Sequence, residues 1–410
     1  MEVNKKFFWH KTFLALKYPN YKLWFFGQLV SLFGSWMQTT AQGFFIYELT
    51  HSSAYLGYVG FATGLPTWIF MLYAGVIADR VSRKKTLLIT QTAMMILAFI
   101  LASLTFLKIV QPWHIICLAA GMGIANAFDA PARQAFVREL VEPEALTNAI
   151  ALNSAMFNTA IALGPAMGGI IYAALGPGWC FVINGITFIA VISALARMKI
   201  VFSFLKNTVN SPFEDLKQGI KYTIRHPTIR FLILTIAIMA LFGVTFVTLL
   251  PAWAVKILHG DARTNGYLQT ARGLGALTSA LFIASLGIFN FKGKLLTIGT
   301  FLFPLFIILF TTSNNFLLSI IFLFGAGMSQ ILIMNLSNSL VQLQVEEAMR
   351  GRVMGIYTFL FFGLLPFGAL LIGTVAQIFS ERSAILIAGS ITLIYATLLY
   401  LLNRPVWNLK

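Results

Sequence analysis

Long apolar segments, repeated along nearly the whole chain, constrain this sequence more than any other feature. Six of them precede a polar stretch and six follow it, at about 22–47, 52–78, 86–107, 113–137, 145–174, 179–197, 228–256, 264–288, 295–312, 315–341, 351–378 and 383–402. An α-helix needs about 20 apolar residues to cross the hydrocarbon core of a bilayer. The sequence therefore predicts an all-α membrane protein with twelve transmembrane helices.

The composition supports a protein embedded in the lipid bilayer. Hydrophobic residues make up 58% of the 410 residues and charged residues only 10%, and the mean hydropathy is +0.82. Soluble domains carry about 25% charged residues. The two cysteines, Cys117 and Cys180, give neither a disulfide framework nor a metal-binding spacing. We expect no metal and no other cofactor.

The net charge of +16 is distributed by membrane face. Of the 29 Lys and Arg residues, the predicted spans leave Lys108, Lys256, Arg263 and Arg382 on one face and Arg272 inside a span. The excess of Lys and Arg marks the cytoplasmic face of a membrane protein. The distribution predicts that both termini lie in the cytoplasm, and it argues against a nucleic-acid partner.

The polar stretch between the two sets of spans divides the chain. Residues 198–227 predict a cytoplasmic linker with a short amphipathic helix. We expect one six-helix half at 1–197 and a second at 228–410. The halves resemble each other, because Val141-Glu-Pro-Glu opens the fifth span and Val345-Glu-Glu opens the eleventh. This pattern predicts two pseudo-symmetric halves.

The loop after the second span carries the most specific motif, Gly75-Val-Ile-Ala-Asp79-Arg80-Val-Ser-Arg83-Lys-Lys. It resembles the signature loop between the second and third helices of the major facilitator superfamily, with Ser82 in place of a family glycine. The resemblance implies that Asp79, Arg80 and Arg83 belong to a cytoplasmic latch that steadies the outward-facing state. Gly75 would let the second and eleventh helices approach closely. A simple positive-inside anchor is the alternative.

A second motif lies in the fifth span, Gly164-Pro165-Ala-Met-Gly168-Gly169. It resembles the G-P-x-x-G-G element that is typical of antiporters in this superfamily. A proline bends a helix, and glycines permit tight packing between helices. We expect this packing at the interface between the halves. A kink of the kind found in any membrane bundle is the alternative.

Ionisable residues inside spans are expensive, so each is a functional hypothesis. The fourth span places Asn126, Asp129 and Arg133 on one helical face. Asp129 and Arg133 can pair, because they are four residues apart. We predict that they join the cytoplasmic latch, with Asp129 facing Arg83. Proton transfer by Asp129 is the alternative.

Two further ionisable residues are candidates for binding a proton or a substrate. Glu48 lies near the outer end of the first span, where burial among apolar neighbours would suit a proton carrier. A solvated helix end is the alternative. Arg272, in the eighth span, has Gln269 one turn away and no acidic neighbour in sequence. It should face a cavity, a carboxylate of another helix or an anionic substrate.

Polar side chains form stripes along two of the predicted spans. Gln38 and Gln42 belong to a stripe in the first span, and Asn335 and Asn338 belong to one in the tenth. The first, fourth, eighth and tenth spans line a central cavity in the resembled fold, and the resemblance implies the same here. Hydrogen bonding between neighbouring helices is the alternative.

The motifs favour a transporter over an enzyme. The sequence contains neither a phosphate-binding loop nor a hydrolase motif, so a gradient would have to drive transport. Tyr47-Glu-Leu-Thr and Asp129-Ala-Pro-Ala-Arg resemble the bacterial branch with macrolide-efflux and enterobactin-export proteins.

This resemblance implies a protein of the bacterial cytoplasmic (inner) membrane that exports amphipathic small molecules, such as drugs or siderophore-like compounds, in exchange for protons. Its two halves would rock around a central site, and we expect a monomer. A lipid or lysophospholipid transporter of the same fold and a non-transporting receptor are the alternatives.

Overall fold

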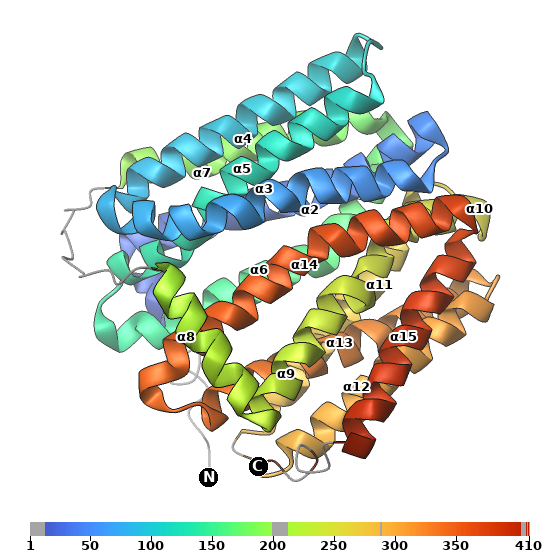
Figure 1. The fold of residues 1–410 in the computed structure, drawn as a ribbon. Helices are drawn as coiled ribbons and strands as arrows, with labels where there is room; N and C mark the ends of the chain where they lie inside the picture. Colours follow the sequence, from blue (N-terminus) through green and yellow to red (C-terminus); the bar gives the residue numbers. More distant parts are fainter. Residues whose placement is uncertain (1–12, 199–211, 288, 403–406, 408, 410) are drawn as a thin grey trace, which may run out of the picture.

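The computed structural model describes residues 13–198, 212–287, 289–402, 407 and 409, with the backbone alone at 72, 74–80 and 212–216. The first half of the chain forms two short 3₁₀ helices and six long α-helices (Figure 1). These are η1 (Leu14–Lys17), α2 (Pro19–Thr50), α3 (Ser53–Arg80), α4 (Arg83–Phe106), α5 (Pro112–Phe136) followed by η2 (Val137–Glu139), α6 (Pro143–Leu175) and α7 (Pro177–Arg197).

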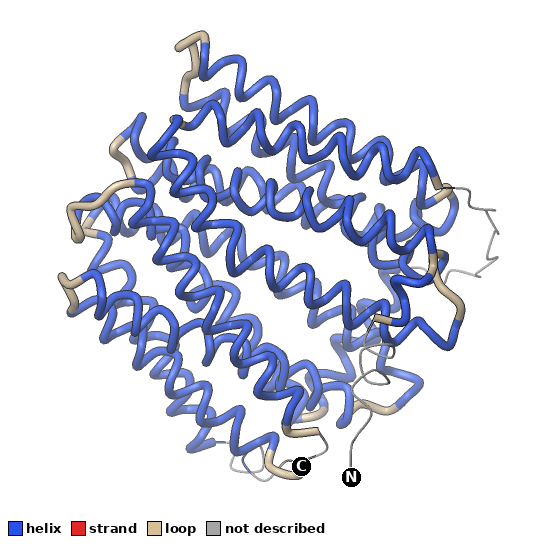
Figure 2. The backbone as a smooth tube through the Cα atoms, turned by 180° about the vertical axis from the view of Figure 1, so that it is seen from behind, coloured by secondary structure: helices blue, strands red, loops and turns tan. Residues whose placement is uncertain are grey.

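A short helix, α8 (Pro212–Arg225), separates this half from a second set of helices and confirms the predicted linker helix. The helices of the second half are α9 (Pro227–Ile238), η3 (Met239–Gly243), η4 (Val244–Leu249), α10 (Leu250–Lys256), α11 (Ala262–Ser285), α12 (Lys292–Thr312), α13 (Phe316–Gln344), α14 (Glu347–Ile378) and α15 (Glu381–Leu402). Seen from behind, the same long helices run roughly side by side (Figure 2).

The number of spans agrees with the prediction. Within the described ranges, nine helical segments are both long and apolar enough to cross a membrane. Helices α2, α3 and α11 are 32, 28 and 24 residues long and pack in the same bundle. Six spans therefore lie on each side of α8, and the all-α membrane fold with twelve spans is confirmed.

The seventh predicted span, 228–256, is not one continuous α-helix. After α9 the backbone forms a π-helical turn, η3, and a 3₁₀ turn, η4, before α10 begins. Pro251 lies in the first turn of α10, and its ring excludes the carbonyl that a continuous α-helix would place four residues earlier. The turn before the proline tightens accordingly.

The two ends of the bundle are named here by residues. The Arg83 end holds the turn between α3 and α4, the η2 turn and α8. The Glu381 end holds the turns between α2 and α3 and between α14 and α15. Between the halves, α3 packs along α14 and α6 packs along α11, while α7 packs on α2, α4 and α6 of its own half. These two helix pairs form the main contact between the halves.

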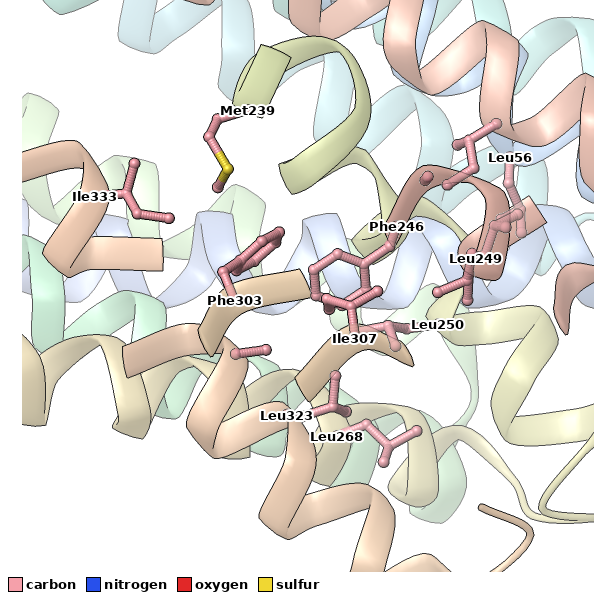
Figure 3. Close-up of a cluster of buried hydrophobic side chains, with 14 of the residues drawn as sticks. Leu56, Met239, Phe246, Leu249, Leu250, Leu268, Phe303, Ile307, Leu323 and Ile333 are labelled. Atoms are coloured by element: carbon pink, nitrogen blue, oxygen red, sulfur yellow. The ribbon is translucent and has the colours of Figure 1, made fainter. Parts of the chain in front are cut away.

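Two hydrophobic cores divide the bundle unequally. One core spans both halves, and Figure 3 shows part of it, with Leu249 of the second half beside Leu56 of α3 and Phe246, Phe303 and Met239 farther into the second half. The first half contributes to this joint core through residues near the Glu381 end only: Ala41, Phe44, Phe45, Ile46, Tyr47, Leu56, Leu101, Ala102, Ile115, Tyr172, Cys180 and Phe181.

The other large core belongs to the first half alone. All of its residues fall between Ala15 and Met198, and its largest members include Trp24 and Phe136, whose rings meet edge to face. Burial of apolar surface is the main term that stabilises such clusters. The halves therefore share a core near the Glu381 end, and the first half keeps a core of its own near the Arg83 end.

Candidate functional site

A buried carboxylate, Glu381, joins the two halves at one end of the bundle. It is the first residue of α15 and only 3% exposed. Its Oε1 accepts a hydrogen bond from Ser53 Oγ of α3 at 2.6 Å and one from Lys256 Nζ of α10 at 2.7 Å. A buried carboxylate needs such partners to offset the loss of hydration. Ser53 belongs to the first half, and Lys256 belongs to the second.

Neighbouring groups extend this network along the same seam. Gln377 Oε1 of α14 accepts from Ser52 Oγ at 2.8 Å and from the Ser53 backbone N–H at 3.1 Å. That N–H is one of the helix-start donors that lack a partner within their own helix. Lys256 Nζ also lies 6.0 Å from the centre of the Tyr47 ring, in reach of a cation–π contact. We did not predict this network from the sequence.

Glycines hold α3 and α14 in backbone contact beside this network. A Cβ on Gly57 would lie 2.7 Å from a carbonyl oxygen of α14, and one on Gly373 would lie 2.8 Å from Gly57 Cα. The seam continues to Gly363, where a Cβ would meet the Trp68 ring at 2.4 Å. The sequence had suggested Gly75 for this close approach. The surroundings of Gly75 fall outside the described side chains.

The Gly-Pro motif of α6 faces two helices. A Cβ on Gly164 or Gly168 would lie 2.6 Å or 2.8 Å from atoms of α2, which belongs to the same half. A Cβ on Gly169 would lie 2.5 Å from a carbonyl oxygen of α11 in the other half, where Gly266 in turn approaches the Pro165 carbonyl. The expected packing between halves therefore involves Pro165 and Gly169, and the other two glycines pack within the first half.

At the Arg83 end, the charged loop after α3 is only partly described. Asp79 and Arg80 form the last turn of α3, and their side chains fall outside the description. Arg83 begins α4, and its Nη1 lies 2.5 Å from Glu139 Oε1 in η2. The sequence had suggested that Arg83 faces Asp129. In the structure Arg83 pairs with Glu139 instead. The reason is that η2 brings Glu139 to the surface beside Arg83, whereas Asp129 lies deeper.

Asp129 of α5 forms a buried network that joins three helices of the first half. It is 1% exposed, and its Oδ1 accepts from Thr90 Oγ1 at 2.9 Å and from Gln91 Nε2 at 2.7 Å. Its Oδ2 lies 3.7 Å from Arg133 Nε, so the predicted pairing along the helix is confirmed. Ser31 of α2 donates to Gln91 Oε1 at 3.5 Å.

The polar stripe of α2 has a different use from the one expected. Gln38 is buried, and its Oε1 accepts from Asn184 Nδ2 of α7 at 2.6 Å. Since α7 packs within the first half, Gln38 acts as interhelical glue rather than as a residue turned to the other half. Gln42 is also buried, and Asn126 of α5 is half-buried.

Glu48 lies at a solvated helix end. Its side chain is exposed, and Tyr172 Oη of α6 donates a short hydrogen bond to its Oε2. The phenol orients the carboxylate but does not remove it from water. The structure therefore favours the alternative reading of Glu48 over a buried proton carrier.

Arg272 of α11 is a partly buried cation near the contact between the halves. Its Nη1 donates to Gln330 Oε1 of α13 at 3.3 Å, and its buried Nε has no hydrogen-bond partner. No described carboxylate lies within 4.0 Å of it. One turn earlier, Gln269 Oε1 accepts from Thr40 Oγ1 of α2 at 3.4 Å, and its Nε2 donates to Asn265. Gln269 therefore bridges the halves.

The predicted polar stripe of α13 lies on the part of this helix that leads to the Arg83 end. Asn335 is exposed, and Asn338 is half-buried and accepts a 2.6 Å hydrogen bond from Gln342 on the same helix. These amides lie between Arg272's partner Gln330 and the Arg83 end of α13. The described site therefore combines one unpaired cation, several amides and a closed seam.

Two six-helix sets that pack against each other through paired helices are the arrangement of the major facilitator class of membrane transporters. The chain belongs to the family described as transmembrane secretion effectors, which it matches over residues 11–410. The expected superfamily is confirmed, and the protein is a transporter and not an enzyme. Its membrane-spanning helices and its similarity to bacterial transporters of this family make it a multi-pass protein of the bacterial inner membrane.

Relatives with curated functions align along almost the whole chain. The staphyloferrin A transporter of Staphylococcus aureus is 26% identical over 94% of this chain and 96% of its own length. The enterobactin exporter EntS of Citrobacter koseri is 26% identical over 95% and 93%. Macrolide efflux protein A of Streptococcus pyogenes is 20% identical over 95% and 98%. The predicted likeness to the macrolide-efflux and enterobactin-export branch is confirmed.

A solved structure supports the fold independently. The bacterial homolog to the human lysosomal transporter Spinster, in an inward-facing and unoccupied conformation, superposes with a TM-score of 0.71. The superposition covers 95% of this chain and 98% of the other, at 15% sequence identity. At this identity the likeness establishes the shared fold.

Proposed function

We propose that this protein exports small amphipathic molecules from the bacterial cytoplasm in exchange for protons, by alternating access between two rocking halves. The names of the relatives, a siderophore exporter and a macrolide efflux protein among them, support export of small molecules. The distribution of Lys and Arg supports cytoplasmic termini. Under this assignment the Arg83 end is cytoplasmic, the Glu381 end is external, and the working unit is a monomer.

One observation carries the mechanism: the described contacts between the halves are concentrated toward one end. The Glu381 network, the α3–α14 glycines and the joint core all connect the halves near the Glu381 end. At the Arg83 end, the described ion pairs and the separate core stay within the first half. Two rigid halves with one closed end form the kind of bistable interface that alternating access uses.

The division at 1–197, 198–227 and 228–410 fits this proposal, because the first half keeps a core and two ion pairs of its own at the Arg83 end. In the state that opens the Glu381 end, we expect the Arg83 end to close. The latch of Gly75, Asp79, Arg80 and Arg83 would then contact the second half. Asp129 and Arg133 would support it from behind, through α4 and α5.

Arg272 is the proposed contact for the substrate. A cation that lies in a membrane span without a carboxylate partner is expected to contact an anion or to face a polar cavity. Its proximity to Gln269, which already bridges to the other half, places it where both halves could sense a ligand. The same observation favours a second candidate function, transport of an anionic lipid or lysophospholipid, because a phosphate headgroup offers the missing charge.

The proton site is proposed at Asp129 rather than at Glu48. Asp129 is the more deeply buried carboxylate, and a carrier must alternate between a hydrated and a dehydrated setting. Glu48 is exposed in the closed end of the bundle. The sequence had favoured Glu48, so both belong in the test.

The test is substrate-driven proton movement in vesicles that hold the purified protein and a trapped pH dye. A panel of cationic, neutral and anionic amphiphiles is added to wild type, Asp129→Asn, Glu48→Gln and Arg272→Gln. We expect substrate-driven proton movement in wild type and in Glu48→Gln, and none in Asp129→Asn. In Arg272→Gln we expect the response to anionic compounds to be lost and the response to cationic and neutral compounds to remain.

Two results would contradict the proposal in different ways. If compounds cross wild-type vesicles with no proton signal, antiport is wrong and facilitated transport replaces it. If labelled anionic lipids cross while no amphiphilic drug does, the lipid transporter is the correct function.

A further inference from the structure

A groove lies between α2 and α7 at the Arg83 end, apart from the contact between the halves. It has a volume of about 760 Å³ and lies between the first turns of α2 and the last turns of α7. Its lining includes Lys22, Leu23, Phe26 and Val30 of α2 and Arg197 of α7. Because the main described contacts of α7 are with α2, α4 and α6 of the first half, the groove lies away from the contact between the halves.

The wall of the groove is apolar. Leu23, Phe26 and Val30 recur at the spacing of one helical face, and all three are exposed, Phe26 by 50%. The floor is closed by Gly27, where a Cβ would lie only 3.0 Å from Ala194 Cβ of α7. From Lys22 to Val30 the wall is about 12 Å long at the rise of an α-helix. That length matches the upper part of an acyl chain.

The rim of the groove carries two cations. Lys22 and Arg197 are both exposed, and both line the groove. The ion pairs of the described chain do not include either side chain, so no described carboxylate neutralises them. Lys22 lies in the first turn of α2 and Arg197 is the last residue of α7, and the ends of membrane-spanning helices are where lipid headgroups are found. The groove therefore combines an apolar wall with an unbalanced positive rim.

We infer that this groove binds an anionic phospholipid of the adjacent membrane leaflet. The phosphate lies between Lys22 and Arg197, and one acyl chain lies along Leu23, Phe26 and Val30. Basic pockets between transmembrane helices select anionic headgroups in this way. A soluble anion would contact the two cations of the rim but not the apolar wall. A neutral lipid would contact the apolar wall but would gain nothing from the two cations. The site is separate from the proposed transport pathway and does not depend on the proposed function.

Native mass spectrometry of the delipidated full-length protein in detergent tests the site. Phosphatidylglycerol and phosphatidylethanolamine are added at equal concentration, and the bound fractions are compared. We expect wild type to prefer phosphatidylglycerol and Lys22→Gln/Arg197→Gln to lose that preference. At about 1 kcal/mol for each cation, the loss is roughly fivefold for either single variant and about thirtyfold for both.

Two controls separate the site from general surface charge. Lys217→Gln/Lys221→Gln also removes two exposed cations, from α8 at the same end of the bundle, and should keep the wild-type preference. Ala190→Phe fills the groove without changing its charge, and should weaken binding of both lipids while the protein stays folded. Millimolar inorganic phosphate should not displace the lipid.

The proposal is overturned by any of four results. Wild type could show no preference between the lipids, the α8 control could lose as much preference as the groove variant, or inorganic phosphate could compete fully. The last result would mean a site for soluble anions in place of a lipid site. An unaffected Ala190→Phe would show that the acyl chain does not occupy the groove.

Discussion

Each end of the bundle holds a buried carboxylate, and the two differ in whether their hydrogen-bond donors come from one half or from both. Glu381 is 3% exposed and Asp129 is 1% exposed, and each accepts from one hydroxyl and one nitrogen donor. The donors to Asp129, Thr90 and Gln91, belong to its own half. One donor to Glu381, Ser53, belongs to the opposite half. The first network can persist when the halves rock, and the second has to break.

Because of this difference, the two hydrogen-bond networks should affect different properties of the protein. A network inside one half stabilises that half in both positions of the halves as long as its carboxylate is ionised, so its loss should appear in unfolding. A network between halves is made in one state only, so its loss should appear in the balance of states. Variants at the two ends should therefore move different measurements.

The largest effect is expected for Gly373→Leu, in the seam beside Glu381. Even the Cβ would lie 2.8 Å from Gly57 Cα and from the Ser53 carbonyl oxygen, so α3 and α14 could not close. Overpacking of this kind costs about 1–3 kcal/mol, which corresponds to a transport loss of roughly fivefold to 150-fold. Efflux from loaded vesicles measures it. Gly355→Leu on the same helix is the control, because no atom of the described side chains and backbone lies within 4 Å of its Cβ position. Equal losses of efflux in Gly373→Leu and Gly355→Leu would contradict a role for close contact between α3 and α14.

Breaking the Lys256–Glu381 pair should open the same end without steric strain. Lys256→Gln leaves a buried carboxylate with Ser53 alone, whereas Glu381→Gln leaves a lysine that is 45% exposed and can be hydrated. We expect Lys256→Gln to shift the balance by about 1–3 kcal/mol and Glu381→Gln by about 1 kcal/mol, both toward the open state.

Spin labels on opposite halves measure this opening. Tyr58 and Ile378 are exposed positions near the Glu381 end and suit labelling, in a background with the exposed Cys117 changed to Ser. The label distance should lengthen in both variants, and more in Lys256→Gln. A reversed order would mean that the exposed part of Lys256, and not the buried carboxylate, sets the cost.

Asp129→Ala should act on stability and leave the Glu381 end closed. It removes the acceptor for Thr90 and Gln91 and leaves buried donors unsatisfied, at a cost of about 1–3 kcal/mol. Asp129→Asn keeps an acceptor oxygen and should cost less. Thermal unfolding in detergent compares the two. If Asp129→Ala lengthened the label distance between Tyr58 and Ile378, its network would not be confined to one half.

Much of the fold was predictable because span length and charge placement follow from the bilayer itself. The spans, the linker helix and the Asp129–Arg133 pair required only hydropathy and helical spacing. Which neighbour a polar side chain faces does not follow from spacing. Gln38 fitted a cavity stripe as well as a contact with Asn184, and only the packing of α7 decides between them.

The Glu381 network was missed for a related physical reason. Its members lie at the very ends of predicted spans, where a charged residue is ordinary and signals only a membrane boundary. In the sequence, Lys256 is one of four cations on one predicted membrane face, and nothing marks Ser53 as its partner. Their meeting depends on how α3, α10 and α15 converge, and sequence separations of over a hundred residues give no local signal of it.

The smallest effect is expected for the Arg83–Glu139 pair, at the opposite end from Glu381. Its side chains are 17% and 20% exposed, and both belong to the first half. A double-mutant cycle with Arg83→Gln and Glu139→Gln should give a coupling of about 1 kcal/mol or less in thermal unfolding, because a partly hydrated pair gains little. If Arg83 also serves the latch, Arg83→Gln should lower transport by far more than this coupling explains, whereas Glu139→Gln should not. Equal losses of transport in both variants would instead make Arg83 a structural partner of η2, and the latch would have to rest on Asp79 and Arg80.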